Sequence, residues 1–301
     1  MRYLLTMLMA LIAAPAGAVV SEDKPYTLAN TLVHTLSSPE NGDYKILVSW
    51  PQGKAPAEGW PVIYLLDGES VFPGAVSLMQ RLTCERCPLV PGVIVAIDYP
   101  EESRRERDYR PAVDEIVLEA NPAGGTYPPG KPGEAQKFWQ FIDTELKPWV
   151  AQRWKTNPQR QALFGHSYGG LFTTWLFMTS PKAFQHFYAA SPSVWWNNRY
   201  LLRTAQNWQP DDSRAHLSVY VGEYEQSLQP HEMKLPEARR AVLAQHRGQR
   251  AMVDGARQLA ESLKAKAPQR VDFSLVEGQT HLTIAPLVLH GAIINHFAKS
   301  E

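Results

Sequence analysis

The chain has 301 residues, of which 30 are basic and 30 are acidic, so its formal net charge is zero at pH 7. This balance gives no general reason to expect a nucleic acid or an acidic membrane surface as partner. A hydrophobic share of 44% over this length is sufficient for one sizeable α/β domain, and the sequence contains no internal repeat or low-complexity tract.

The N-terminus has the pattern of a secretory signal. Arg2 supplies the charged start, residues 3–14 are apolar apart from one threonine, and Ala16-Gly17-Ala18 forms a small-x-small cleavage pattern. The apolar run is shorter than the roughly 20 residues that a membrane-spanning helix needs. We therefore expect cleavage after Ala18, which removes residues 1–18 and leaves 19–301 as a single exported domain without a transmembrane segment.

The first half of the chain predicts mainly strands. Residues 26–37 and 45–50 look like two strands around a turn, and residues 60–66 and 90–99 are continuous apolar strands. Strands without polar alternation are typical of sheets that helices cover on both faces. Further along come a charged segment at 101–111, a loop rich in proline and glycine at 121–133, and a helix with one apolar face at 138–150.

The two cysteines, Cys84 and Cys87, lie between the strands expected at 60–66 and 90–99. In an exported protein this spacing favours a small disulfide that pins a loop. A redox pair would stand at the start of a helix, whereas here Pro88 and a strand follow. Further zinc ligands are not found nearby, and we expect neither a metal ion nor another cofactor.

The second half of the chain alternates strands with helices. Strands are expected up to Gly165 and at 187–190, 216–221 and 271–276; helices are expected at 171–178, 252–263 and 282–299; residues 226–250 read as a polar insertion. The helix at 171–178 is apolar nearly all round and should be buried. This alternation predicts the α/β class, with one domain built on a mostly parallel central sheet and helices on both faces.

Residues 165–169 read Gly-His-Ser-Tyr-Gly, a G-x-S-x-G pattern with an apolar strand before it and a helix after it. Strand, sharp turn and helix together are the setting of the nucleophile elbow of serine hydrolases. The turn is so tight that side chains at its two glycine positions would be crowded. It exposes the Ser167 hydroxyl at the carboxyl end of a strand, near the positive end of a helix dipole. We therefore predict that Ser167 is a catalytic nucleophile.

A serine hydroxyl needs a base to take its proton and an acid to orient that base. With this elbow the chain order is serine, acid, histidine, each at the end of a later strand. His281 directly follows a strand-like run in a loop, so we predict it as the base, while the elbow should turn His166 away. The other downstream histidines look like helix or insertion residues: His186, His231, His246, His290 and His296.

The acid is predicted at Glu225, which follows the strand at 216–221 and precedes the polar insertion. Glu223, Asp254 and Glu277 are alternatives. A carboxylate that did not reach the imidazole would leave a Ser-His dyad, and the sequence leaves this open.

The predicted chemistry also requires an oxyanion hole, in which two backbone N–H groups point to where negative charge develops. One donor should be the N–H of Tyr168, the residue after the nucleophile. The other should come from the loop at 67–69, which ends the apolar strand at 60–66.

Seven segments together resemble the esterase D-like branch of the α/β hydrolases, and within it the periplasmic trilactone siderophore esterases. They stand in the family's order: 64–68 (YLLDG), 107–111 (RDYRP), 141–148 (FIDTELKP), 165–170 (GHSYGG), 190–196 (ASPSVWW), 222–225 (GEYE) and 278–281 (GQTH). The resemblance implies an α/β-hydrolase domain over 19–301, with Ser167 as nucleophile, His281 as general base and Glu225 as acid. Similarity to the related mycolyltransferases implies the Glu69 N–H as second oxyanion donor.

The resemblance also implies a small-molecule substrate, the trilactone of a catecholate siderophore such as enterobactin or its glucosylated relative salmochelin. Such a ligand is anionic when it holds iron. Arg107 and Arg110 are candidates for cationic contacts, and Trp195 and Trp196 are candidates for stacking on catechol rings. From the residues alone, the tryptophans could equally be packing residues and the arginines part of a solvated face.

We therefore expect an exported serine esterase that opens a siderophore trilactone by acylation of Ser167 and subsequent hydrolysis. The same machinery could act on another ester, such as a short acyl or feruloyl ester, or could transfer the acyl group to an acceptor other than water. A protein of a different class would bind the siderophore without catalysis, but the complete serine and histidine positions argue against it.

Overall fold

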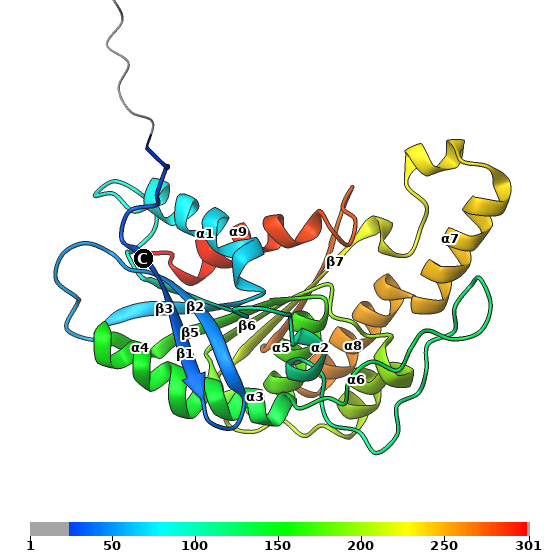
Figure 1. The fold of residues 1–301 in the computed structure, drawn as a ribbon, viewed down its shortest axis with the longest axis horizontal. Helices are drawn as coiled ribbons and strands as arrows, with labels where there is room; N and C mark the ends of the chain where they lie inside the picture. Colours follow the sequence, from blue (N-terminus) through cyan, green and yellow to red (C-terminus); the bar gives the residue numbers. More distant parts are fainter. Residues whose placement is uncertain (1–23, 300–301) are drawn as a thin grey trace, which may run out of the picture.

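A computed structural model of the chain describes residues 24–299, so the expected signal peptide lies outside the described residues. Within them, eight strands form one sheet in the order β1-β2-β4-β3-β5-β6-β7-β8 (Figure 1). The two pairs that include β2 are antiparallel and the other pairs are parallel, so the expected mostly parallel sheet is confirmed. The strands are β1 (Thr31–Ser38), β2 (Gly42–Ser49), β3 (Trp60–Leu66), β4 (Val93–Asp98), β5 (Thr156–His166), β6 (His186–Ala190), β7 (His216–Gly222) and β8 (Val271–Val276).

Helices cover both faces of the sheet. On one face lie α1 (Gly68–Leu82) and α9 (Ile284–His296); on the other lie α3 (Ala135–Phe141), α5 (Tyr168–Thr179) and α8 (Met252–Lys266) (Figure 1). The remaining helices are α2 (Arg105–Asp108), α4 (Lys147–Arg153), α6 (Trp196–Asn207) and α7 (Glu237–Arg250), with shorter turns at η1 (Ile142–Leu146), η2 (Pro181–Ala183), η3 (Glu223–Glu225) and η4 (Pro230–Lys234).

Strand β3 shows why the central strands have no polar alternation in the sequence. Val62 and Tyr64 belong to the apolar core on one side of the sheet, and Ile63 and Leu65 belong to the core on the other side. Successive side chains of a strand point to opposite faces, so a strand between two helical layers needs apolar residues at every position.

Several elements differ from the expectation in extent. β1 begins at Thr31 rather than at residue 26, because its ladder with β2 starts where Thr31 pairs with Ser49. The helix expected at 138–150 begins at Ala135, passes through the π-helical turn η1 and ends at Arg153. The polar insertion at 226–250 contains α7, which has no buried residue and projects from the body of the molecule (Figure 1). The segment is strongly polar and contributes nothing to the core, so the sequence read it as an insertion and not as a helix.

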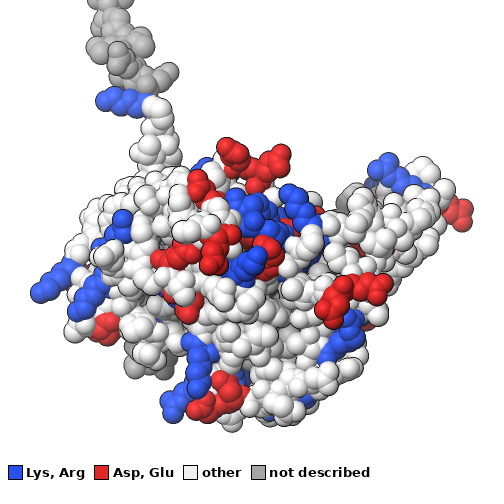
Figure 2. Space-filling model, turned by 60° about the horizontal axis from the view of Figure 1, so that its bottom comes forward, with Lys and Arg blue, Asp and Glu red and all other residues white. Residues whose placement is uncertain are grey.

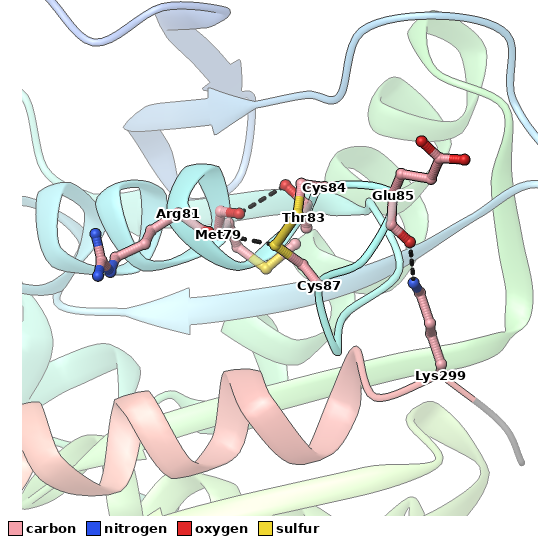
Figure 3. Close-up of a disulfide and its surroundings, with 7 residues drawn as sticks. All are labelled: Met79, Arg81, Thr83, Cys84, Glu85, Cys87 and Lys299. Carbon is pink, nitrogen blue, oxygen red and sulfur yellow. Dashed lines mark hydrogen bonds between the residues drawn. A yellow bond between two sulfur atoms is a disulfide. The ribbon is translucent and has the colours of Figure 1, made fainter.

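The expected disulfide between Cys84 and Cys87 is present just after α1 (Figure 3). The Cys87 N–H donates to the Cys84 carbonyl at 3.0 Å, so the bond closes a tight turn. Lys299 Nζ donates to the Glu85 carbonyl at 3.0 Å, which ties the segment after α9 to this turn. Among residues 24–299, no helix is both long and apolar enough to span a bilayer.

Candidate active site

The turn between β5 and α5 has the geometry of a nucleophile elbow. Ser167 has a φ of 61° and a ψ of −116°, a conformation that side chains rarely adopt, and its N–H donates to the Ala190 carbonyl at 3.0 Å. A Cβ at Gly165 would lie 2.3 Å from the Gly169 carbonyl oxygen, and one at Gly170 would lie 2.8 Å from that of Ala190. The turn can therefore form only with glycine at these positions.

The structure brings Ser167, His281 and Glu225 together from three separate loops. His281 Nε2 lies 3.0 Å from Ser167 Oγ, and His281 Nδ1 lies 2.7 Å from Glu225 Oε2. The Glu225 carboxylate is an acceptor, so Nδ1 carries the proton and Nε2 presents its lone pair to the serine hydroxyl. The side chain of Glu225 is only 1% exposed, whereas that of His281 is 39% exposed, so the buried acid orients a base that substrate can reach.

The other carboxylate oxygen of Glu225 accepts two hydrogen bonds that fix the side chain in place. Its Oε1 accepts the Gly222 N–H at 2.7 Å and the Ser191 Oγ–H at 2.5 Å. Ser191 is fully buried at the end of β6 and has a φ of 45°. The sequence assigned no role to Ser191, although this residue lies in the ASPSVWW segment. Nothing in the residues around Ser191 indicates that it will bind a carboxylate 34 residues away.

The alternative acids make other contacts. Glu223 Oε2 accepts the Gly278 N–H at 2.8 Å, which braces the loop before His281. Asp254 exchanges hydrogen bonds with the Gln226 side chain at 2.5 and 3.0 Å. Neither of these two carboxylates is hydrogen-bonded to His281.

His166 does not turn away from the site, so that expectation was wrong. Its ring centroid lies 4.6 Å from that of His281. Burial, followed by the neighbouring His281, lowers the pKa of His166 to about 4. His166 is therefore neutral near pH 7 and adds no positive charge beside a ring that becomes an imidazolium when it takes the serine proton.

The Glu69 N–H, expected as second oxyanion donor, is engaged elsewhere. It donates to Asp98 Oδ2 at 2.6 Å, and the Glu69 side chain pairs with Lys45. Asp98 ends β4 beside the N-terminus of α1, where unpaired N–H groups and the helix dipole attract a carboxylate. The sequence did not show that Asp98, at the end of the neighbouring strand β4, would accept the Glu69 N–H.

A guanidinium lies beside the elbow, and the sequence had not singled it out. Arg105 binds Asp67 through Nε to Oδ1 at 2.9 Å and through Nη2 to Oδ2 at 3.2 Å, and Nη2 lies 3.4 Å from the His166 carbonyl oxygen. Asp67 thus supports the elbow through Arg105.

A cleft of about 660 Å³ opens beside Ser167. Tyr168, Trp195, Trp196 and Arg110 line it, together with parts of the loop at 116–130, residues 197–199 and residues 249–250. Trp196 is 4% exposed and therefore largely a packing residue, whereas Trp195 is partly exposed and contacts the Arg250 guanidinium at 4.1 Å. Trp195 is thus the more accessible stacking surface.

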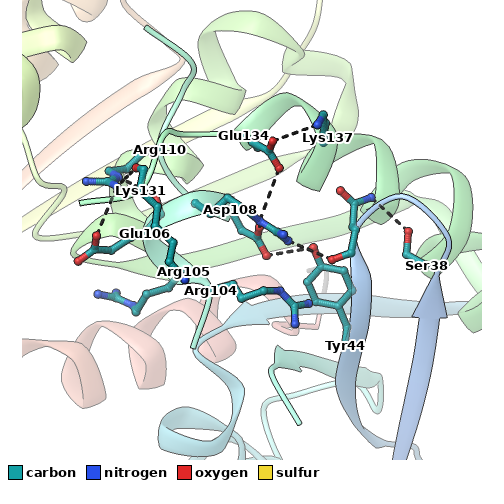
Figure 4. A network of polar contacts seen from close by, with 12 residues as sticks. Ser38, Tyr44, Arg104, Arg105, Glu106, Asp108, Arg110, Lys131, Glu134 and Lys137 are labelled. Atoms are coloured by element: carbon teal, nitrogen blue, oxygen red, sulfur yellow. Dashed lines mark hydrogen bonds and ion pairs between the residues drawn. The ribbon is translucent and has the colours of Figure 1, made fainter. Parts of the chain in front are cut away.

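Arg107, a candidate for cationic contacts with substrate, is not among the residues that line the cleft. Its Nε donates to Asp108 Oδ1 at 2.7 Å and its Nη2 to the Asn41 carbonyl at 3.1 Å. Asp108 also accepts the Tyr44 hydroxyl at 3.0 Å (Figure 4). A buried carboxylate needs a cationic partner, and Arg107 supplies it.

Arg110 does line the cleft, and its Nε and Nη2 are hydrogen-bonded within the chain. Its Nε donates to the Glu106 carbonyl at 2.6 Å, its Nη2 donates to the Lys131 carbonyl, and Nη2 lies 3.3 Å from Glu106 Oε2 (Figure 4). The guanidinium carbon lies 5.6 Å from the Tyr168 ring centroid and 5.9 Å from that of Trp196. Arg110 therefore braces the aromatic wall next to the nucleophile.

One ion pair joins the insertion at 226–250 to the loop at 116–130. Arg250, at the end of α7, binds Glu119 through Nε to Oε1 at 2.5 Å and through Nη2 to Oε2 at 2.9 Å. The ring of His246 packs edge-on against Tyr127, with centroids 5.9 Å apart. The insertion and the loop at 116–130 thus form one wall, which the sequence could not reveal because Glu119 and Arg250 are 131 residues apart.

Comparisons with known proteins place this site in context. The chain matches the family model described as "Putative esterase" over residues 37–228. It is 34% identical to the ferri-bacillibactin esterase BesA of Bacillus subtilis over 89% of this chain and 90% of that protein. The siderophore enterobactin esterase of Emericella nidulans is also 34% identical, over 61% of this chain and 64% of that protein. The structure of the siderophore hydrolase EstA from Aspergillus nidulans superposes with a TM-score of 0.80 at 29% identity, and covers 92% of this chain and 96% of its own.

Proposed function

Because the chain belongs to the esterase family and has siderophore esterases among its relatives, we propose that it hydrolyses the ester bonds of a siderophore through an acyl enzyme at Ser167. The observation that carries the proposal is the hydrogen-bonded line from Ser167 Oγ to His281 Nε2 at 3.0 Å and from His281 Nδ1 to Glu225 Oε2 at 2.7 Å. This line begins at a strained turn that opens into a cleft, where a hydroxyl can reach an ester carbonyl.

In acylation, His281 Nε2 takes the Ser167 hydroxyl proton while Oγ forms a bond to the ester carbonyl carbon. The C–O bond to the departing alcohol then breaks, and that alcohol takes the proton from Nε2. In deacylation a water molecule replaces the serine: His281 takes a proton from the water, the oxygen attacks the acyl carbon, and the proton returns to Ser167 as the acid leaves.

Charge development in these steps matches the groups around the serine. Glu225 stabilises the imidazolium of His281, and the neutral His166 does not oppose it. The Tyr168 N–H at the start of α5 is the proposed oxyanion donor, and the Glu69 N–H can join it only after Asp98 releases it. Loss of one such donor typically costs on the order of 10²–10³ in turnover.

The proposed substrate is a cyclic triester with aromatic arms, such as enterobactin or salmochelin. Two relatives carry enterobactin and salmochelin in their names, at 34% identity in each case. A cleft of about 660 Å³ with an accessible tryptophan offers room and a stacking surface for one catechol arm while a lactone carbonyl reaches Ser167.

The proposal includes export, with residues 19–301 as the catalytic domain in the periplasm after removal of residues 1–18. The disulfide between Cys84 and Cys87 supports this, because such bonds persist mainly in oxidising compartments. N-terminal sequencing of the protein from a periplasmic extract would test it, and an N-terminus at Met1 would contradict it.

Mass spectrometry of reaction products tests the catalytic proposal. Wild-type protein should convert micromolar enterobactin to linear esters and dihydroxybenzoylserine, and Ser167→Ala should not. Turnover of p-nitrophenyl butyrate without turnover of enterobactin would indicate an esterase for other substrates. Absence of labelling by a fluorophosphonate probe, with quenching of tryptophan fluorescence by the siderophore, would indicate a binding protein.

A further inference from the structure

The cationic side chains at the cleft are already neutralised or hydrogen-bonded within the chain. Arg250 makes a bidentate pair with Glu119, and Arg110 is paired with Glu106. Arg199 donates through Nη1 to the Arg250 carbonyl at 2.6 Å and through Nη2 to the Gln249 carbonyl at 3.1 Å. Of these three guanidiniums, only that of Arg199 bonds to carbonyls and not to a carboxylate.

The formal charge of the cleft is therefore small. Its lining includes three arginines and two glutamates, a net charge of +1. On the face shown in Figure 2, basic side chains lie beside acidic ones instead of gathering in a patch of one sign. An enzyme that captures a multiply charged anion gains from a cleft whose field is strongly positive, and this cleft lacks such a field.

Siderophores of the proposed class differ sharply in charge. A ferric tris-catecholate is a trianion, because each catechol loses both protons to bind iron. The iron-free catecholate is close to neutral near pH 7, because its hydroxyls keep their protons, and a ferric trihydroxamate is also neutral. A cleft of small net charge favours the neutral ligands, since entry into the cleft removes water from a trianion without supplying matching cations.

We infer that Glu119 makes this cleft selective for siderophore esters of near-zero net charge over ferric tris-catecholates, an inference that rests on the proposed function. Glu119 cancels the charge of Arg250 at the place where the Arg250 guanidinium lies over the Trp195 ring, in the wall of the cleft. An anionic arm that stacked on Trp195 would meet the Glu119 carboxylate as well as the guanidinium. The aromatic surface is thereby kept for neutral rings.

The test compares kcat/KM for three ligands: iron-free enterobactin, ferric enterobactin and ferric triacetylfusarinine C, a neutral trihydroxamate ester. Wild type should prefer the iron-free over the ferric catecholate by about tenfold or more. The comparison with the neutral ferric hydroxamate separates the effect of charge from that of iron. Glu119→Gln keeps an oxygen for Arg250 but removes the negative charge. It should raise kcat/KM for ferric enterobactin roughly five- to tenfold, mainly through KM, and leave the iron-free ligand within about twofold.

Two further variants secure the interpretation. Glu237→Gln removes the same charge from the exposed first turn of α7, outside the cleft, and should leave every ratio unchanged. Arg250→Gln should shift the preference in the opposite direction, against the ferric catecholate. The Glu119→Gln effect should shrink as ionic strength rises.

The inference is overturned if wild type prefers ferric enterobactin. It is also overturned if Glu119→Gln changes kcat/KM for ferric and iron-free enterobactin by the same factor. Hydrolysis of p-nitrophenyl butyrate with no hydrolysis of any siderophore would overturn the proposed function, and this inference with it. If the protein hydrolyses siderophores but Glu119→Gln leaves the ratio of kcat/KM for iron-free and ferric enterobactin unchanged, the inference alone is overturned.

Discussion

Two groups of serine, histidine and acidic side chains lie at opposite edges of the parallel part of the sheet. Ser167, Glu225 and His281 follow the carboxyl ends of β5, β7 and β8. The second group lies towards the amino ends of β6, β7 and β8 and consists of His186, His216, Ser218 and Asp272. Both groups contain the residue types of a catalytic triad, but they differ in every feature that gives those types reactivity.

In the amino-end group, His186 Nε2 lies 3.0 Å from Ser218 Oγ and 3.2 Å from His216 Nδ1, and His216 Nε2 lies 3.2 Å from Asp272 Oδ2. The sequence had placed His186 in a helix or insertion; it is in fact the first residue of β6, and its ring stacks on that of Tyr188 at 4.0 Å. The histidine is thus a strand residue whose polar partners come from the next strand.

Ser218 lies inside a regular strand between β6 and β8 and is 5% exposed. Ser167 stands on a strained turn beside a helix N-terminus and a cleft. The comparison shows that a serine and a histidine within hydrogen-bonding distance do not make a nucleophile. The nucleophile needs an exposed hydroxyl and space for a substrate, and only the carboxyl end of this sheet provides both.

The largest difference in activity is expected between substitutions of Ser167 and Ser218. Ser167→Ala should reduce ester hydrolysis by roughly 10⁴-fold or more, because the atom that forms the acyl bond is gone. Ser218→Ala should change it less than twofold. Turnover of p-nitrophenyl butyrate and labelling by a fluorophosphonate probe measure both; a labelled Ser167→Ala protein would refute the assignment.

The second largest difference in activity is expected between substitutions of Glu225 and Asp272. Glu225→Gln should lower kcat on the order of 10²–10⁴, because the amide no longer stabilises the His281 imidazolium or holds the productive tautomer. Asp272→Asn, whose side chain is 63% exposed, should leave kcat within twofold. A decrease below threefold for Glu225→Gln would show that a Ser-His dyad is sufficient.

The strain at the elbow can be tested through stability. Gly165→Ala places a methyl group 2.3 Å from the Gly169 carbonyl oxygen and should destabilise the protein by roughly 3 kcal/mol. Gly291→Ala, in α9 with no atom within 4 Å of the added methyl, should stabilise it by about 0.5–1 kcal/mol. Chemical denaturation of both variants measures the difference, and equal midpoints would contradict a crowded elbow.

A further effect should appear in the pH dependence of stability. Burial is the main cause that lowers the pKa of His166 to about 4 and those of His186 and His296 to about 3, whereas unfolded histidines titrate near 6.5. Between about pH 6.5 and 4 the unfolded chain binds more protons than the folded chain, so the free energy of unfolding falls as the pH falls.

Thermal unfolding at a series of pH values measures this slope. Tm should decrease steadily from about pH 6.5 to 4, and His186→Gln should make the decrease shallower, since one histidine contributes at most about 3 kcal/mol over this range. A Tm that stayed constant down to pH 4 would contradict the neutral, buried state of these rings.

Much of the site could be predicted because its signals are local. The strands at 60–66 and 271–276 have the expected bounds, since continuous apolar runs show where strands lie between two helical layers. The elbow is set by glycines within a few residues of Ser167, and His281 and Glu225 follow strands in the expected order. Helix α7 was missed because its segment is strongly polar and buries no residue, so it read as an insertion.

The sequence by itself determined the α/β class, the position of the elbow, and the serine and histidine that would meet at the carboxyl edge of the sheet. The tertiary structure alone decided that Asp98 takes the Glu69 N–H, that Arg107 neutralises Asp108 away from the cleft, and that Glu119 neutralises Arg250 inside it. The physical reason is competition. Backbone geometry follows from nearby residues, whereas a polar group binds whichever partner the folded chain brings within reach, and those partners lie on distant segments.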